Sequence, residues 1–273
     1  MARYQIILAY DGTDFQGFQR LKGGRSVQGE VEAALRRLDW AGKAILSAGR
    51  TDAGVHASGQ VIAFDLDWAH SPETLRQALN AYLPEDVAAQ AVKLAAPGFH
   101  PRYDALARTY HYRIFHHPVR DPLRERYAWR VDHPVDGQLL NAAAALLVGT
   151  HDFAAFGSPP KKGGRTVRSV HAADWVRGEQ PDEWTFRVTA NAFLYHMVRR
   201  MVYLTVRVGM GKLGLDQLAR EIDGAEMTIP GLAPPGGLTL VHVQYPPDGQ
   251  EHDGFVETLT ASGENDSGED VRH

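Results

Sequence analysis

The sequence predicts an α+β protein made of two ferredoxin-like α/β halves with a cleft between them. Over residues 1–105, apolar runs rich in β-branched residues alternate with segments of helical periodicity. Their order is strand, helix, strand, strand, helix, strand, which is the order of a ferredoxin-like unit. A similar succession recurs over residues 106–247. With 273 residues, 44% of them hydrophobic, the chain has enough material for one large domain or two of ordinary size.

Turn and helix-start signals separate the elements of the N-terminal half. Asp11-Gly12 ends the apolar opening run in a turn, and Ser26 precedes helical spacing in the position of an N-cap. A second helix is expected to start at Ser71-Pro72 and to end before Leu83-Pro84, because proline suits a first helical turn and disfavours helix in the residue before it. The predicted strands of this half are 3–10, 44–46, 61–64 and 87–94.

The C-terminal half repeats this pattern. A strand over 107–115 alternates, with Tyr110 on one of its faces, and Asp136 caps the helix that follows. Further strands are predicted at 170–176, 184–188 and 238–245. The long helix after residue 194 is predicted to turn Met197, Val198, Met201, Leu204, Thr205 and Val208 inward. Polar residues lie elsewhere around this helix: His196, Arg199, Arg200 and Arg207.

Composition excludes several classes of protein. No apolar run approaches the roughly 20 residues that span a bilayer, and the start of the chain does not resemble a signal peptide. There is no cysteine, which excludes disulfides, thiolate metal sites and cysteine nucleophiles. The 13 histidines show no metal-ligand spacing. We therefore expect a soluble cytoplasmic protein without a bound metal or cofactor.

The charge of the chain is unevenly distributed. Residues 248–273 hold eight acidic residues and one arginine, a net charge of -7, so the remaining body carries +3 of the total of -4. The tail is acidic and shows no periodicity, which predicts disorder. The body has stretches without acids, from 158 to 173 and from 185 to 215, that contain several arginines and lysines. Such stretches favour a polyanionic partner such as RNA, although a charge run is more often a solvated face.

One polar segment stands out between two of the predicted strands, Gly49-Arg50-Thr51-Asp52-Ala53-Gly54-Val55-His56-Ala57. In extended backbone, residues two apart point the same way, so Arg50 and Asp52 could share a face. An adjacent guanidinium holds a carboxylate ionised, as a nucleophilic carboxylate requires. The simpler interpretation is a glycine-rich hairpin with an ion pair in its loop.

Several collinear segments together resemble the TruA family of tRNA pseudouridine synthases. The resemblance runs from about residue 4 to residue 245 and leaves only the tail uncovered. The matching blocks are Tyr10-Asp11-Gly12-Thr13 through Gly17-Phe18-Gln19, Gly49 through Ala57, Leu79-Asn80 with Leu83-Pro84, Arg108-Thr109-Tyr110-His111-Tyr112, His151-Asp152-Phe153 with Phe156, Phe193-Leu194-Tyr195-His196-Met197-Val198-Arg199, and Ala233-Pro234-Pro235-Gly236-Gly237-Leu238.

The resemblance implies two halves joined into one mostly antiparallel sheet, with helices on one side and a central active-site cleft. It implies a homodimer that converts uridine to pseudouridine without a cofactor, at positions 38–40 in the anticodon stem-loop of tRNA. By motif, Asp52 is the catalytic aspartate, Arg199 its basic partner and Tyr110 a contact of the target base. The same blocks make Arg50, His56 and Phe193 candidate substrate-binding residues.

Pseudouridylation suits this residue set. The reaction breaks the N1–C1′ bond and joins C5 to C1′ without redox change or group donor. A carboxylate can add to C6 of the base, or promote cleavage at C1′ as in glycosidases, and the sequence leaves both routes open. Tyr110 can stack on uracil and accept the C5 proton. The target uridine is expected to be flipped from the stem, and Arg50 would stabilise the flipped nucleotide or occupy its place.

Other interpretations remain open at this point. A metal-dependent nuclease would need convergent carboxylates, and a non-catalytic RNA-binding protein would explain the basic stretches but not Asp52. Taken alone, Tyr110 is a core tyrosine and Arg199 a phosphate contact or surface charge. One departure from the family pattern is visible: Arg200 and Tyr203 stand where asparagine and glycine are usual, which puts close helix packing there in question.

Overall fold

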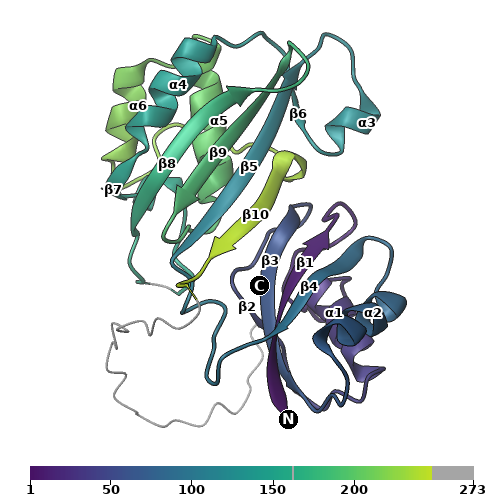
Figure 1. The fold of residues 1–273 in the computed structure, drawn as a ribbon. Coiled ribbons are helices and arrows are strands. Elements are labelled where there is room, and N and C mark those ends of the chain that lie inside the picture. The colour runs from purple at the N-terminus through teal and green to yellow at the C-terminus, as the bar shows by residue number, and fades with distance from the viewer. Residues whose placement is uncertain (162, 248–273) are drawn as a thin grey trace.

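The computed structural model describes residues 1–161 and 163–247, so the predicted tail lies outside the described residues. Ten strands form one sheet in these residues, with β4-β1-β3-β10-β5-β9-β8-β7 as its main path (Figure 1). The strands are β1 Ala2–Tyr10, β2 Leu46–Ser47, β3 His56–Leu66, β4 Val87–Leu94, β5 Ala107–His116, β6 Trp129–Val131, β7 Gly149–Asp152, β8 Val167–Arg177, β9 Glu183–Ala190 and β10 Leu238–Gln244. The helices are α1 Val27–Arg36, α2 Pro72–Tyr82, α3 Pro122–Glu125, α4 Gly137–Leu146, α5 Met197–Gly209 and α6 Leu215–Ile222, with 3-10 turns η1 Ala154–Phe156 and η2 Pro235–Gly237.

The sheet confirms the predicted duplication. In the N-terminal half the strand order is β4-β1-β3-β2, and in the C-terminal half it is β10-β5-β9-β8. Numbered within each half without the short strands β6 and β7, both orders read fourth, first, third, second, and all neighbours in these two orders are antiparallel. The short β6 pairs with β5 in parallel. The two halves are thus two copies of the same βαββαβ arrangement.

A short parallel pairing joins the halves. Thr239 and Leu240 of β10 pair with His56 and Ala57 at the start of β3. The strands approach so closely here that a Cβ added to Gly59 would lie 2.2 Å from the carbonyl oxygen of Val241. Because β3 begins directly after the segment that carries Asp52, this junction fixes the place of that segment between the halves.

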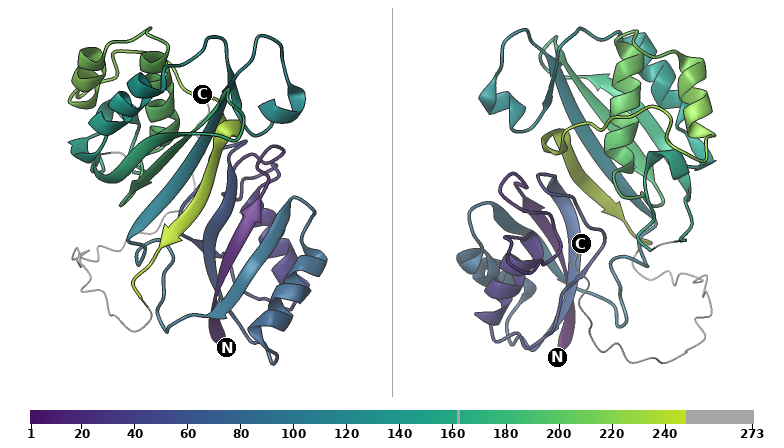
Figure 2. Two further views of the ribbon diagram at one scale, coloured as in Figure 1. Left: turned by 45° about the horizontal axis from the view of Figure 1, so that its top comes forward. Right: turned by 180° about the vertical axis from the view of Figure 1, so that it is seen from behind.

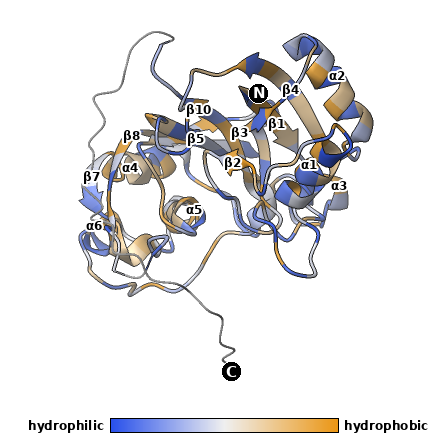
Figure 3. Cartoon of the chain, turned by 90° about the horizontal axis from the view of Figure 1, so that it is seen from below, coloured by the Kyte–Doolittle hydropathy of each residue, from blue (hydrophilic) through white to orange (hydrophobic). Residues whose placement is uncertain are grey.

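The predicted helix starts are confirmed. The side chains of Ser26, Ser71 and Asp136 each accept a hydrogen bond from a backbone N–H in the first turn of α1, α2 and α4. Seen from behind, the helices of both halves lie on the same side of the sheet, as expected (Figure 2). Viewed from below, α4, α5 and α6 gather on one side of the strands of the C-terminal half (Figure 3).

Each half has its own hydrophobic core between sheet and helices. Strand β10 contributes to both cores: Leu238 packs in the C-terminal core, whereas Leu240 and Val243 pack in the N-terminal one. The side chains predicted to face inward from α5 are all buried, but Arg200, predicted on the polar side, is also buried. Its guanidinium pairs with the buried Glu221, which offsets the cost of enclosing its charge.

Several strand boundaries differ from the prediction, and the largest difference lies next to the signature segment. The strand expected at 44–46 shrinks to β2, Leu46–Ser47, and β3 starts at His56, five residues before the predicted 61–64. The signature segment is therefore a loop only up to Val55. Among the described residues, no helix combines the length and the apolar character needed to cross a membrane.

Candidate active site

The loop that carries Asp52 rests on the opening block of the chain. The backbone N–H of Phe18 donates to the carbonyl of Thr51 (3.0 Å), and that of Gly54 donates to the carbonyl of Phe15 (3.3 Å). Below the loop, the hydroxyls of Tyr10 and Thr51 are 2.8 Å apart and buried. These contacts explain why the opening block and the signature segment belong to one site although they lie far apart in the sequence.

Asp52 forms an ion pair with Arg199 of α5. Arg199 Nη1 donates to Asp52 Oδ2 at 3.1 Å, and the two side chains are only 13% and 16% exposed, arginine first. Arg199 Nε donates to the carbonyl of Ala233 (2.8 Å), which fixes the guanidinium from a second direction. The pair brings together residues 147 positions apart, one from each half of the chain. The cation beside the carboxylate is thus supplied by the other half.

Arg50 does not provide that cation, contrary to the expectation that it would share a face with Asp52. Its side chain is exposed and forms no hydrogen bond or ion pair with the described residues. Arg50 and Asp52 lie outside the strands β2 and β3, so no strand imposes the alternation that would align their side chains. The simpler interpretation is confirmed in part: the segment connects the antiparallel strands β2 and β3 as a hairpin, but Asp52 pairs with Arg199 and not with Arg50 of the loop.

His196 is a site residue that the sequence analysis did not single out for chemistry. Its Nε2 lies 3.5 Å from Asp52 Oδ2, and its ring stacks on Tyr195. Burial lowers the pKa of His196, and the negative charge of Asp52 opposes this shift. The residue has a left-handed backbone, with φ of 68°, immediately before α5. Left-handed backbone at a residue other than glycine often marks a functional site, but nothing in the sequence predicts it at His196.

Tyr110 and Phe193 form an aromatic pair beside the carboxylate. Their rings meet edge to face, 5.2 Å apart at 88°, and both side chains are half-buried. Burial raises the pKa of Tyr110, and the nearby charge of Asp52 adds to the effect. The phenol is therefore protonated near neutral pH, with its ring at the boundary of both cores.

His56 lies outside this group of side chains. It is buried at the start of β3, where its Nδ1 accepts from the backbone N–H of Gly12 (3.0 Å) and its Nε2 donates to the carbonyl of Gly236 (3.0 Å). Burial lowers the pKa of His56, which favours this neutral tautomer, although Asp11 Oδ1 lies 3.1 Å from Nδ1 and opposes the shift. Both ring nitrogens are engaged by the protein, so no nitrogen is left for a substrate.

Comparison with known proteins matches the sequence to one family. A sequence model of that family, described as tRNA pseudouridine synthase, matches residues 6–104 and 143–246. The chain belongs to the tRNA pseudouridine synthase family. The tRNA pseudouridine synthase A of a Geobacillus species is 39% identical over 246 residues, covering 89% of this chain and 98% of the relative. The enzyme of the same name from a Roseiflexus species is 40% identical over 252 residues, covering 91% and 93%.

The resemblance drawn from the sequence motifs is confirmed by these matches, and the chain is an isomerase of this family. Among solved structures, an archaeal box H/ACA sRNP Nop10-Cbf5 complex is 13% identical, with a TM-score of 0.39. That alignment covers 76% of this chain and 44% of the other.

The structure of this tRNA pseudouridine synthase offers no support for the nuclease alternative. Within residues 1–161 and 163–247, no group of three or more His, Asp or Glu side chains has the arrangement of a metal site. The carboxylate of Asp52 lies instead beside the guanidinium of Arg199 and the imidazole of His196.

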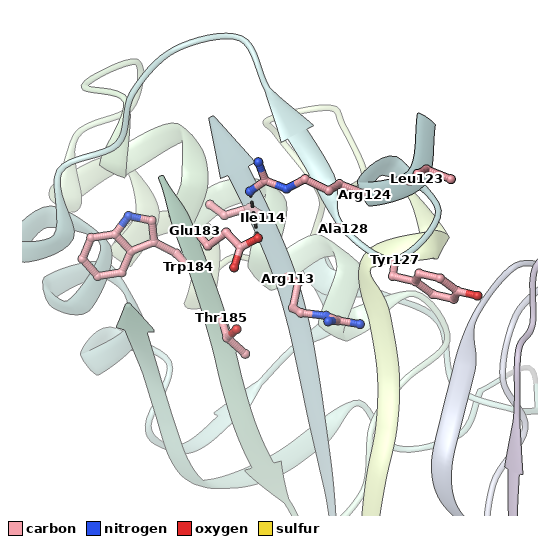
Figure 4. Close-up of a pocket in the computed structure, with 9 residues that line it drawn as sticks. All are labelled: Arg113, Ile114, Leu123, Arg124, Tyr127, Ala128, Glu183, Trp184 and Thr185. Carbon is pink, nitrogen blue, oxygen red and sulfur yellow. Dashed lines mark hydrogen bonds and ion pairs between the residues drawn. The ribbon is translucent and has the colours of Figure 1, made fainter. Parts of the chain in front are cut away.

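A separate pocket of about 210 Å³ lies on the C-terminal half (Figure 4). It is lined by Arg113, Ile114, Leu123, Arg124, Tyr127, Ala128, Glu183, Trp184 and Thr185. Arg124 is neutralised there by Glu183 at 2.8 Å and by Asp182 at 3.1 Å. None of the site residues named above lines it, so the site at the junction of the halves is distinct from this pocket.

Proposed function

We propose that this enzyme converts uridine to pseudouridine at positions 38–40 in the anticodon stem-loop of tRNA, with Asp52 as the catalytic carboxylate. The observation that carries the assignment is the Asp52–Arg199 pair, assembled from both halves beside the Tyr110–Phe193 aromatic pair. Family membership supports the reaction and the tRNA substrate. The positions in the stem-loop follow from the sequence resemblance alone.

In this proposal Arg199 places a positive charge beside Asp52 and aims one carboxylate oxygen. A charged, oriented carboxylate serves equally in addition to C6 and in displacement at C1′ of the uridine. Either route ends with N1–C1′ broken and C5–C1′ formed. The C5 proton leaves to a base, and N1 takes up a proton. A non-catalytic RNA-binding protein would have no use for a carboxylate held in this way.

Tyr110 stacks against the uracil in the proposed complex, next to Phe193. Its raised pKa favours hydrogen-bond donation and stacking by the neutral phenol over proton acceptance in the resting enzyme. Proton acceptance from C5 then requires that the phenol first lose its own proton within the complex. The role of Tyr110 is therefore tested most sharply at the step in which a base takes the C5 proton.

Arg50 is the exposed cation on the same loop as Asp52. We assign it to the flipped nucleotide or to the place that the nucleotide leaves, because its guanidinium has no partner among the described residues. Phosphate and base edges both bind guanidinium well. A homodimer and a cytoplasmic location belong to the same proposal. The homodimer rests on the family resemblance, and the cytoplasmic location rests on the composition of the sequence.

The assay is incubation of the purified protein with unmodified tRNA in monovalent salt with a chelator, followed by position-resolved detection of pseudouridine. We expect modification confined to positions 38–40, and activity that survives chelation of prefolded tRNA. Pseudouridine elsewhere in the tRNA would contradict the assigned positions. A requirement for added divalent ion with prefolded tRNA would contradict the mechanism.

A further inference from the structure

Residues 228–233, between α6 and η2, lie against α5. We call this segment the strap. Two side chains of α5, one turn apart, hold it. Arg200 Nη1 donates to the carbonyl of Gly231 at 2.8 Å. The ring of Tyr203 lies so close to Gly231 that a Cβ added there would be 2.1 Å from it, and Gly231 has a φ of 134°, which suits glycine.

A buried carboxylate completes this clamp. Arg200 Nη2 donates to Glu221 Oε1 at 2.6 Å, and both residues are nearly inaccessible, at 2% and 1% exposed. Glu221 also accepts from the backbone N–H groups of Thr228 and Ile229 and from the hydroxyl of Thr228. One ion pair therefore binds the strap both at its start and at Gly231. Arg200 and Tyr203, the two departures from the family pattern, act on the same segment.

The far end of the strap reaches the active site. The carbonyl of Ala233 accepts from Arg199 Nε, and the backbone N–H of Ala233 donates to the carbonyl of Arg199 (3.3 Å). Arg199 in turn holds Asp52. Shortly after the strap, Pro235 contacts the loop of Asp52, where a Cβ on Gly54 would lie 2.9 Å from it. A shift of the strap is thus transmitted to both members of the catalytic pair.

We propose that Arg200, Tyr203 and Glu221 are positioning residues: by clamping the strap they hold the Ala233 carbonyl where it aims Arg199 at Asp52. This inference rests on the proposed roles of Asp52 and Arg199. Loss of the clamp lets the Ala233 carbonyl shift, and the Arg199 guanidinium then points at Asp52 in only part of the population. Displacements of about 1 Å in such a constellation cost up to roughly a hundredfold in rate.

The test compares Arg200→Met/Glu221→Gln with the wild-type enzyme. The double variant removes both buried charges together, because a single removal would leave a buried charge unpaired and endanger folding. The amide oxygen of the introduced glutamine can still accept from the backbone of Thr228. We expect kcat for unmodified tRNA to fall by roughly tenfold to a hundredfold, with KM within about twofold, since the clamp is buried and touches no RNA.

Two controls separate positioning from general damage. Arg220→Met makes the same substitution one residue before Glu221, at an exposed side chain away from the strap, and should leave kcat unchanged. In an Arg199→Lys background, where the contact with Ala233 is already altered, adding the double variant should lower kcat far less than it does in the wild type. Thermal unfolding of every variant shows which are folded.

A folded double variant with wild-type kcat overturns the inference. The inference also fails if the decrease in kcat caused by the double variant is as large in the Arg199→Lys background as in the wild type. If the double variant does not fold, Thr228→Val and Tyr203→Leu are judged by the same two criteria. Asp52→Asn is assayed in parallel. Should it retain turnover, the assignment of Asp52 as the catalytic carboxylate fails, whereas an inactive Asp52→Asn beside an unaffected double variant refutes the clamp alone.

Discussion

At the scale of single residues, the site depends on where one guanidinium points. Arg199 donates through Nε to a carbonyl and through Nη1 to the carboxylate of Asp52. Two donors fixed in one plane can hold both partners at once, which a single ammonium cannot do. The distinction between arginine and lysine at this position is therefore one of geometry and not of charge.

Arg199→Lys tests this geometry. The charge is kept, but one ammonium cannot reach both Ala233 and Asp52, so we expect kcat to fall by roughly tenfold to a hundredfold with KM nearly unchanged. Steady-state kinetics on unmodified tRNA measure both constants. Arg220→Lys, at an exposed side chain of α6 and without contact to Asp52, is the matched control. A lysine variant with wild-type kcat would show that charge alone suffices.

His56 belongs to the same scale, but as a structural residue. Its pKa is lowered in the fold by burial, so near pH 7.5 the ring is neutral in both the folded and the unfolded chain. As the pH falls below about 6.5, the unfolded state takes up the proton first, and the free energy of unfolding therefore decreases. His56 stabilises the fold above that pH and loses this contribution as the pH falls through its folded pKa.

We predict that His56→Gln costs about 1–2 kcal/mol at pH 7.5, because one of the two hydrogen bonds is lost. Since glutamine does not titrate, the difference in melting temperature between the two proteins should shrink from pH 7.5 to about pH 5.5, below the ordinary pKa of histidine. Thermal unfolding of both proteins at the two pH values measures this difference in melting temperature. A difference that grows on acidification would mean that the folded pKa of His56 is raised, not lowered.

At the scale of elements, the junction of β3 with β10 decides whether the two halves form one site. Gly59→Ala places a methyl group 2.2 Å from the carbonyl oxygen of Val241, and the strands must separate to admit it. We expect a loss of about 1–3 kcal/mol in the free energy of unfolding. Chemical denaturation measures it, with Gly49→Ala as control, because nothing lies within 4 Å of a Cβ there. Equal stability of the two variants would show that the junction is not closely packed.

The elements themselves were largely predictable from the sequence, since their signals are local. Three helix starts are predicted by side chains that accept a hydrogen bond from a backbone N–H of the first turn, those of Ser26, Ser71 and Asp136. The apolar spacing of α5 predicts its buried face. The parallel pairing of β3 with β10 was not predictable from local signals, because it joins segments far apart in the chain. Burial of Arg200 was missed for the same reason: its partner Glu221 lies on another helix.

The same limit applies to the site. The family motifs named Asp52, Arg199 and Tyr110, and the structure brings Asp52 and Arg199 into contact. Local spacing paired Asp52 with Arg50 instead, because it takes no account of a cation supplied by the other half of the chain. It also missed His196, whose place beside Asp52 depends on a left-handed residue before α5.

At the scale of the whole molecule, the charge is split between a body of +3 and a tail of -7 over residues 248–273. An acidic segment tethered to an RNA-binding body competes weakly with RNA, and salt screens that competition. The division of the body at residues 105 and 106 stays a prediction.

Deleting residues 248–273 should therefore leave kcat and melting temperature unchanged and tighten tRNA binding slightly at low ionic strength only. Affinity and thermal unfolding of the truncated and full-length proteins, at two salt concentrations, test this. A large loss of stability or activity on truncation would show that the tail docks on the body.

The central claim is that Asp52 performs the reaction, and Asp52→Asn tests it most directly. The amide keeps the size and part of the hydrogen bonding of the carboxylate but is a poor nucleophile. The measurement is pseudouridine formed per enzyme molecule on unmodified tRNA, alongside the affinity of the same protein for that tRNA. The account predicts affinity close to that of the wild type and no pseudouridine. Multiple turnovers by pure Asp52→Asn protein would contradict it.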